Sequence, residues 1–82
     1  SYYKTIDEIG KMGEQAQAKR IRVAGNVEDG SIVRKGKEVE FVLVENDKKL
    51  RVVYAGSDPL PDTFKDGSQA LADGRMGPDG VF

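Results

Sequence analysis

Side chains that carry out catalysis are scarce in this chain of 82 residues. It contains no histidine and no cysteine, so these residues supply no imidazole base, thiolate nucleophile, disulfide or ordinary zinc or iron site. Asp62 has no second carboxylate at a spacing that indicates a glycosidase-like pair. The basic residues at 48, 49 and 51 form only a weak phosphate-binding patch, and residues 74–77 have no phosphate-loop pattern. The residue types therefore predict no enzyme.

Length and composition indicate one small domain with balanced charge. A chain of 82 residues has room for a single core. Thirteen basic and fourteen acidic residues give a net charge of −1, which disfavours nonspecific binding of nucleic acid. The sequence has no apolar run of the roughly eighteen residues that a transmembrane helix needs. Because it begins without Met, we expect it to be a fragment of a longer protein.

Residues 1–18 predict an N-terminal segment that precedes the main fold. Thr5 and Glu8 have the spacing of a capping box, in which each residue satisfies a backbone amide of the other. Apolar residues at 6, 9 and 12 then follow at a helical spacing. Two glycines weaken this helix by up to about 1 kcal/mol each relative to alanine. We expect a frayed helix or a loop over residues 5–16.

From residue 19 the apolar residues alternate with a period of two, which is typical of half-buried strands. The first strand is predicted over residues 19–27 and resumes over 31–34, with Gly25 and Gly30 placed to let it bend. The further predicted strands are residues 38–45, 50–54 and 69–76, and the start of a fifth at 81–82. A polar hairpin loop at 46–49 joins the second and third strands, and a tight turn at 77–80 precedes the fifth.

An unusual connection, residues 54–67, joins the third and fourth strands. It contains a short apolar segment, residues 60–64, which we name the plug. Five short antiparallel strands with such a plug predict an all-β, OB-type barrel over residues 19–82. Leu60 and Phe64 would close its open end and join Phe41 and Tyr54 in the core, while Asp62 would cap a one-turn helix. The alternative is an open β-meander or SH3-like barrel, in which the plug has no role.

Several segments resemble the CcmE family of periplasmic haem chaperones, which act in cytochrome c maturation. The segments that match, in the family's order and spacing, are RVAGNV at 22–27, YAG at 54–56, LPDTFKDG at 60–67 and DGRM at 73–76. Residues 2–9 also resemble the segment that follows the family's membrane anchor. The LPDTF element is the most specific of these, and the resemblance covers nearly the whole chain.

The resemblance implies an OB-type carrier of haem that is anchored by an N-terminal helix at the periplasmic face of the bacterial inner membrane. Its implied partners are haem, membrane-bound cytochrome c maturation proteins and apocytochrome c, with no nucleic acid. The family attaches haem covalently through a histidine or cysteine in a motif beyond the position of Phe82. We therefore expect the attachment residue to lie outside these residues, which contain no metal site.

The resemblance also selects two candidate cofactor-binding residues. Arg22 matches an arginine of the family pattern and is expected to bind a haem propionate, because a guanidinium can bond both oxygens of a carboxylate. Its alternative role is a solvated strand residue paired with a cross-strand glutamate. Tyr3, with Tyr2 beside it, is expected to lie against the flat macrocycle, the alternative being packing on the barrel or fraying.

Two other functions compete with haem handling. A nucleic-acid-binding OB module would need a basic groove and exposed aromatic side chains. A structural interaction domain would use the barrel only to present its loops.

Overall fold

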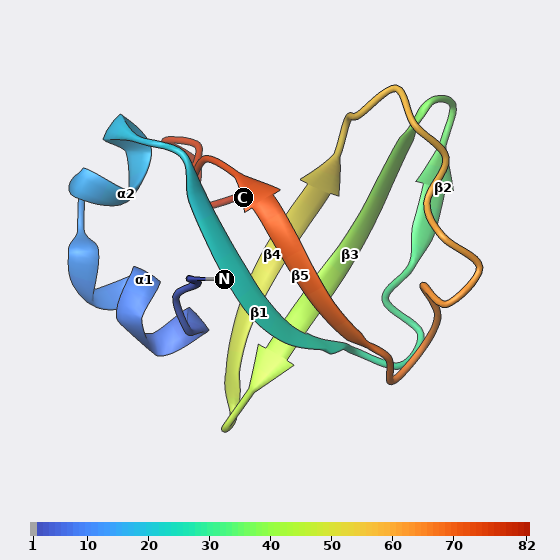
Figure 1. The fold of residues 1–82 in the computed structure, drawn as a ribbon, viewed down its shortest axis with the longest axis horizontal. Helices are drawn as coiled ribbons and strands as arrows, with labels where there is room; N and C mark the ends of the chain where they lie inside the picture. Colours follow the sequence, from blue (N-terminus) through green and yellow to red (C-terminus); the bar gives the residue numbers. More distant parts are fainter. Residues whose placement is uncertain (1) are drawn as a thin grey trace.

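The computed structural model describes residues 2–82. Two short helices precede five strands, and their bounds are α1 (Ile6–Met12), α2 (Gln15–Ala18), β1 (Ile21–Val27), β2 (Val33–Lys35), β3 (Glu38–Glu45), β4 (Lys48–Tyr54) and β5 (Gln69–Gly74). The strands form one sheet in which every pair is antiparallel (Figure 1). The predicted all-β class is therefore confirmed. No helix within residues 2–82 is long and apolar enough to cross a membrane.

β3 is the central strand of the sheet. One of its edges pairs with β4 over residues 39–45. The other edge pairs with β2 at residues 38–40 and with β1 at residues 43–44. β1 and β2 are therefore the two arms of the predicted long first strand, separated by the turn after Val27. β1 also pairs with β5 over residues 21–26.

The sheet does not close into a barrel within the described residues. β4 and β5 are not paired with each other, and β5 ends at Gly74, two residues before the predicted end. The predicted fifth strand is limited to Phe82, whose amide donates to the Arg51 carbonyl (2.9 Å) and whose carbonyl accepts from the Val53 amide (2.8 Å). These bonds flank Val52 in the pattern of a parallel bridge. Closure of the barrel stays a prediction.

The β3–β4 hairpin is tighter than predicted, and the prediction of a four-residue loop at 46–49 is wrong. β4 begins at Lys48, so only Asn46 and Asp47 form the turn. Their φ angles are 50° and 65°, as a type I′ turn requires at both central positions. Asn and Asp tolerate this left-handed conformation better than other non-glycine residues.

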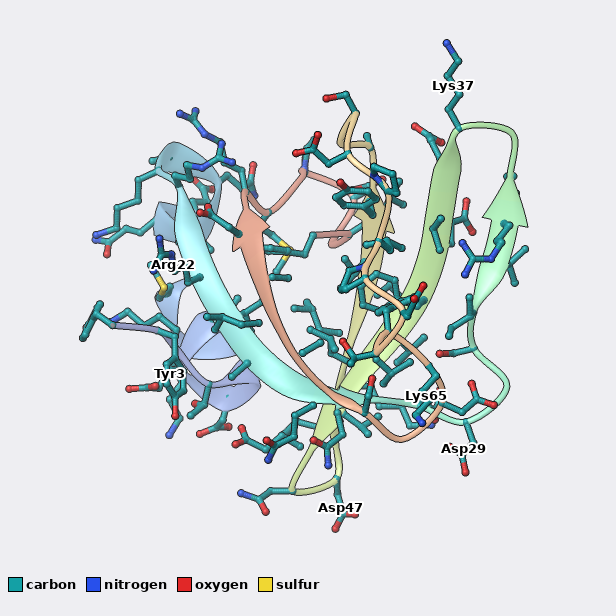
Figure 2. The ribbon with its side chains drawn as sticks, turned by 45° about the vertical axis from the view of Figure 1, so that its right-hand side comes forward. Tyr3, Arg22, Asp29, Lys37, Asp47 and Lys65 are labelled. Carbon is teal, nitrogen blue, oxygen red and sulfur yellow. The ribbon has the colours of Figure 1, made fainter. Side chains whose placement is uncertain are left out.

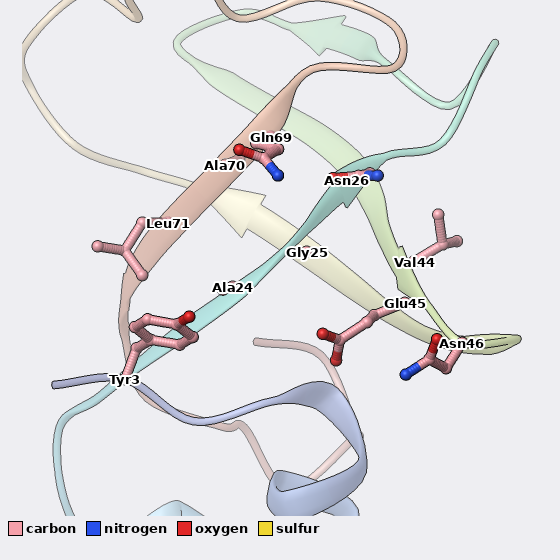
Figure 3. Close-up of a pocket in the computed structure, with 10 residues that line it drawn as sticks. All are labelled: Tyr3, Ala24, Gly25, Asn26, Val44, Glu45, Asn46, Gln69, Ala70 and Leu71. Carbon is pink, nitrogen blue, oxygen red and sulfur yellow. The ribbon is translucent and has the colours of Figure 1, made fainter.

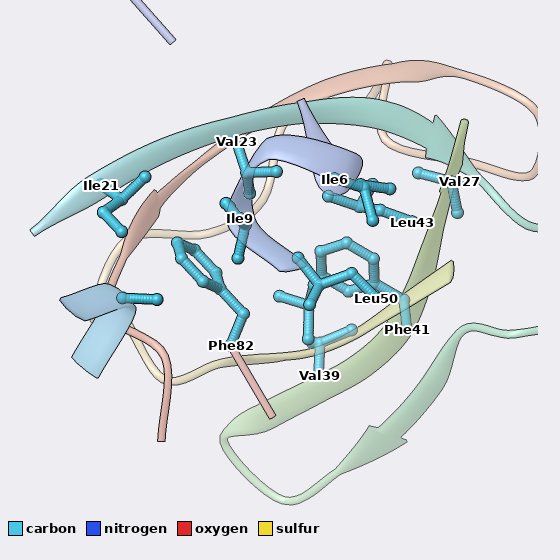
Figure 4. Close-up of a cluster of buried hydrophobic side chains, with 12 residues drawn as sticks. Ile6, Ile9, Ile21, Val23, Val27, Val39, Phe41, Leu43, Leu50 and Phe82 are labelled. Atoms are coloured by element: carbon cyan, nitrogen blue, oxygen red, sulfur yellow. The ribbon is translucent and has the colours of Figure 1, made fainter. Parts of the chain in front are cut away.

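The N-terminal segment forms two helices that pack on the inner side of the sheet. The predicted capping box is confirmed, because the Glu8 amide donates to Thr5 Oγ1 (3.1 Å) and the Thr5 amide donates to Glu8 Oε1 (2.9 Å). α1 buries Ile6 and Ile9, and α2 buries Ala16. Figure 4 shows Ile6 and Ile9 pointing from α1 into the cluster of strand residues. The helices therefore supply part of the core.

The core fills the inner face of the curved sheet (Figure 4). From the strands and the C-terminal end it contains Ile21, Val23, Val27, Val39, Phe41, Leu43, Leu50, Val52 and Phe82. Leu60, Phe64 and Tyr54 are half-buried against this cluster, and the Phe64 ring meets Phe41 edge to face at 4.8 Å. The predicted core role is confirmed for Phe41, whereas Tyr54, Leu60 and Phe64 pack against the core and are only partly buried.

The plug is a turn, and the predicted cap by Asp62 is wrong. The Phe64 amide donates to the Pro61 carbonyl (2.9 Å). The Lys65 amide donates to Ser68 Oγ (3.2 Å) and not to the Asp62 carboxylate. No helix forms between residues 54 and 69. Turn bonds from the Phe64 amide to Pro61 and from the Ser68 amide to Lys65 hold this segment, together with the packing of Phe64 on Phe41.

Candidate functional site on the outer face of the β1 and β5 ladder

The candidate residues gather on the solvent side of the β1–β5 ladder. Val23 and Val27 of β1 point into the core, so the alternation of the strand turns Arg22, Ala24 and Asn26 outward. The register places three outward pairs in a row: Arg22–Asp73, Ala24–Leu71 and Asn26–Gln69. We name these three pairs the outer ladder face.

The N-terminal segment brings Tyr3 to this face. The Lys4 amide donates to the Arg22 carbonyl (2.7 Å), and the Lys4 carbonyl accepts from the Ala24 amide (3.1 Å). These bonds form a parallel bridge between Lys4 and Val23. The capped helix α1 follows directly, so the segment is held on both sides of Lys4. Tyr3 remains 50% exposed beside the ladder.

Two shallow hollows meet at Tyr3. The first has a volume of about 580 Å³ and lies over the small residues Ala24, Gly25 and Ala70, with Leu71 beside the tyrosine ring (Figure 3). Polar side chains from the ends of the strands line its other side. The second has a volume of about 400 Å³ and contains Arg22 with further basic side chains. Both volumes are within the range of small-molecule sites, roughly 300–1,000 Å³.

Asp73 positions the arginines of the second hollow. Nε of Arg20 lies 2.8 Å from one oxygen of its carboxylate, and Nε of Arg22 lies 3.5 Å from the other. The predicted alternative for Arg22, a cross-strand carboxylate, is therefore present, with aspartate in place of glutamate. Such exposed pairs contribute only about 0–1 kcal/mol. A guanidinium has five N–H donors, so Arg22 retains donors for a ligand carboxylate.

Tyr2 and Lys4 form a second contact at the same place. Lys4 Nζ donates to the Tyr2 hydroxyl (3.1 Å) and lies 5.4 Å from the centre of its ring. This hydrogen bond raises the pKa of Lys4. The Tyr2 side chain is 76% exposed. Neither Tyr2 nor Tyr3 packs in the core.

Arg22 and Tyr3, the two residues selected from the sequence, line the same hollow (Figure 2). The sequence interpretation missed Leu71 as part of this face. The alternation within β5 contained the signal, since it turns Leu71 to the same side as the charged Asp73. Arg20 was also missed; it precedes β1, and its ion pair with Asp73 brings it to the same carboxylate as Arg22. Within residues 2–82, no group of three or more Asp and Glu is placed to hold a metal ion.

The fold is that of a small all-β domain with five antiparallel strands in one sheet. Comparison with known proteins gives its family. The sequence model of the CcmE domain matches residues 1–82, and the chain belongs to the CcmE family. The resemblance predicted from the sequence is confirmed.

Three relatives illustrate the match, and each is named cytochrome c-type biogenesis protein CcmE. The one from Brucella anthropi is 41% identical over 81 residues, covering 99% of this chain and 47% of the relative. The one from Polynucleobacter necessarius subsp. necessarius is 40% identical over 80 residues, covering 98% and 54%. The one from Brucella ovis is 38% identical over 81 residues, covering 99% and 47%. The chain spans about half the length of these relatives.

Proposed function

We propose that this domain handles haem during the assembly of c-type cytochromes, as a carrier and not as an enzyme. The observation that supports this is the CcmE match over residues 1–82, together with relatives named for cytochrome c-type biogenesis. The protein would receive haem from membrane-bound maturation proteins and pass it to apocytochrome c at the periplasmic face of the inner membrane. The competing nucleic-acid function finds no support in these relatives.

The outer ladder face is the proposed contact surface for haem. Haem is a flat apolar macrocycle with two propionates on one edge, so it needs an apolar contact beside a cation. The Tyr3 ring and Leu71 supply the apolar contact, and Ala24 leaves the floor between them low enough for a flat ligand. Arg22, at the neighbouring hollow, would bind a propionate. Residues 1–82 contain no histidine or cysteine, the residue types through which the family attaches haem, so these residues would contribute noncovalent contacts only.

We further propose that the sheet belongs to an OB-type barrel. The two arms of the first strand both pair with β3, and the plug lies between β4 and β5, as such a barrel requires. An apolar hollow of about 650 Å³ lies between these two strands and is lined by Phe41, Leu60 and Phe64. A strand that continued the parallel bridge of Phe82 would cover this hollow and join β4 to β5.

Haem titration of the domain tests the contact surface. We expect the Arg22→Gln variant to bind haem about five- to tenfold more weakly, because one charge-assisted hydrogen bond is lost. Tyr3→Ser should weaken binding about two- to tenfold through the lost aromatic contact. Arg34→Gln, on the exposed strand β2, is the matched control and should bind like the parent. Equal binding by all four proteins would show that haem contacts another surface.

A separate experiment tests the function. The longer protein, extended through the attachment motif and produced together with the maturation proteins, should show a covalent haem band on a denaturing gel. Absence of that band would refute the haem-carrier function. Because it is read from the longer protein, this result is distinct from a failure of Arg22 or Tyr3 to affect noncovalent binding.

A further inference from the structure

The hollow beside Tyr3 concentrates positive charge in a chain whose net charge is −1. Four basic side chains and a single carboxylate line it, namely Lys4, Lys19, Arg20, Arg22 and Asp73. Three of these cations have no part in the proposed haem contact. With Tyr2 they form one corner of the molecule, and we name Tyr2, Lys4, Lys19 and Arg20 the basic corner.

Tyr2 gives the basic corner an exposed aromatic side chain. Its 76% exposure exceeds that of the other exposed large hydrophobic side chains of residues 2–82, Tyr3, Val33 and Leu71. A tyrosine combines an apolar ring with a polar tip, and it therefore favours the interface between a membrane and water. The hydroxyl of Tyr2 accepts from Lys4 Nζ, so the ring and the cation are held together.

The cations of the basic corner are held by the fold. Backbone hydrogen bonds fix Lys4 to the edge of β1. Asp73 lies 2.8 Å from Nε of Arg20, and Lys19 has the extended backbone that ends α2 and leads into β1. Three cations on positions fixed by the fold, beside an exposed ring, match a surface that is both anionic and amphipathic.

We propose that the basic corner docks the domain on an anionic lipid bilayer. Phosphates of the lipid headgroups would contact Lys4, Lys19 and Arg20, while the Tyr2 ring would enter the interfacial layer. Lipid is favoured over nucleic acid because single-stranded nucleic acid needs successive aromatic platforms, whereas the basic corner contains one aromatic ring, the exposed Tyr2. The inference is independent of haem handling, since it uses neither Arg22 nor Tyr3.

A tryptophan reporter tests the docking. The chain has no tryptophan, so Tyr2→Trp places a single one in the basic corner. On vesicles of phosphatidylcholine with about one-third phosphatidylglycerol, its emission should shift to shorter wavelength, and high salt should reverse the shift. Vesicles of phosphatidylcholine alone should cause no shift. Val33→Trp is the matched control. Val33 lies on the exposed strand β2 and is 45% exposed, so the emission of this variant should not shift on the anionic vesicles.

Charge variants of the Tyr2→Trp protein measure how much the basic side chains contribute to vesicle binding. Each basic side chain near an anionic bilayer contributes about fivefold in partitioning, so Lys4→Gln with Lys19→Gln should reduce binding about 20- to 30-fold. Lys37→Gln with Lys65→Gln removes the same charge from exposed loops away from Tyr3 and Arg22 (Figure 2) and should change binding less than about fivefold. Circular dichroism checks that all variants are folded.

Three results would overturn the proposal. The first is no emission shift in the Tyr2→Trp protein, or an equal shift on both kinds of vesicle. The second is an equal loss of binding in the two double-glutamine variants, which would show that overall charge decides binding. The third is tighter binding to a single-stranded oligonucleotide than to the anionic vesicles, with the same dependence on Lys4 and Lys19.

Discussion

Gly25 tests how closely β1 packs on β3. A methyl group added at this position would lie 3.1 Å from Leu43 Cβ, 3.3 Å from Ile6 Cδ1 and 3.3 Å from the Val44 carbonyl oxygen. The Ile6 methyl is the end of a flexible side chain and can shift, but the two groups on β3 cannot move without the strand. Overpacking of this kind costs about 1–3 kcal/mol. The smaller entropy of the unfolded alanine chain offsets about 0.4–1 kcal/mol. We therefore expect Gly25→Ala to lower the free energy of unfolding by about 1–2 kcal/mol.

Urea and thermal unfolding, followed by circular dichroism, measure this effect. Each kcal/mol lost from the free energy of unfolding should lower Tm by about 4–8 °C in a domain of this size. Gly10→Ala is the matched control, because a methyl group there meets no atom within 4 Å. It lies inside α1, so alanine should stabilise the protein by about 0.5–1 kcal/mol. A Gly25→Ala protein as stable as the parent would refute the close packing of β1 on β3.

Three further outcomes follow from the structure. Phe64→Ala should lower the free energy of unfolding by about 2–3 kcal/mol, since it removes a half-buried ring that contacts Phe41, and urea unfolding measures this loss. Hydrogen bonding from the Thr5 amide lowers the pKa of Glu8. The stability that this bond provides is present above the usual carboxyl pKa and is lost as the pH falls through the lowered value. Glu8→Gln should therefore weaken the acid dependence of unfolding, and an NMR titration should place the Glu8 midpoint below that of an unfolded peptide. Asp47→Gly should raise the free energy of unfolding by up to about 1 kcal/mol, because glycine adopts the positive φ of the turn without strain. Thermal unfolding would show this as a higher Tm.

Period-two alternation was sufficient to predict β3 with its observed bounds, because its alternate side chains are buried against the core. The same pattern missed the start of β4. Lys48 and Lys49 are both exposed, so they resemble loop residues although they pair with β3. The cap by Asp62 failed because Ser68 accepts from the Lys65 amide instead. Asp62 and Ser68 both lie three residues from Lys65, so the spacing alone does not decide between them.

The candidate site depends even more on pairing between distant segments. Arg22 and Tyr3 were selected through their resemblance to a family, and nothing in their spacing required them to share a hollow. The Lys4 bridge to β1 brings them together, and the β1–β5 register adds Leu71 and Asp73. A sequence contains the alternation of each strand, but the register between strands emerges only when the sheet has formed.

The shallowness of the outer ladder face bears on how a carrier of haem would work. Pockets that hold small molecules tightly bury most of the ligand surface, whereas this face could cover only one side of a flat macrocycle. Tyr3 and Arg22 are both about half exposed, so each noncovalent contact stays in competition with water. Such a face would orient a ligand without retaining it. In the proposed carrier, retention would belong to the covalent bond made elsewhere in the protein, and the ladder would set the direction of the ring and its propionates. Release to an acceptor would then require breaking one bond and a few weak contacts, with no buried pocket to open.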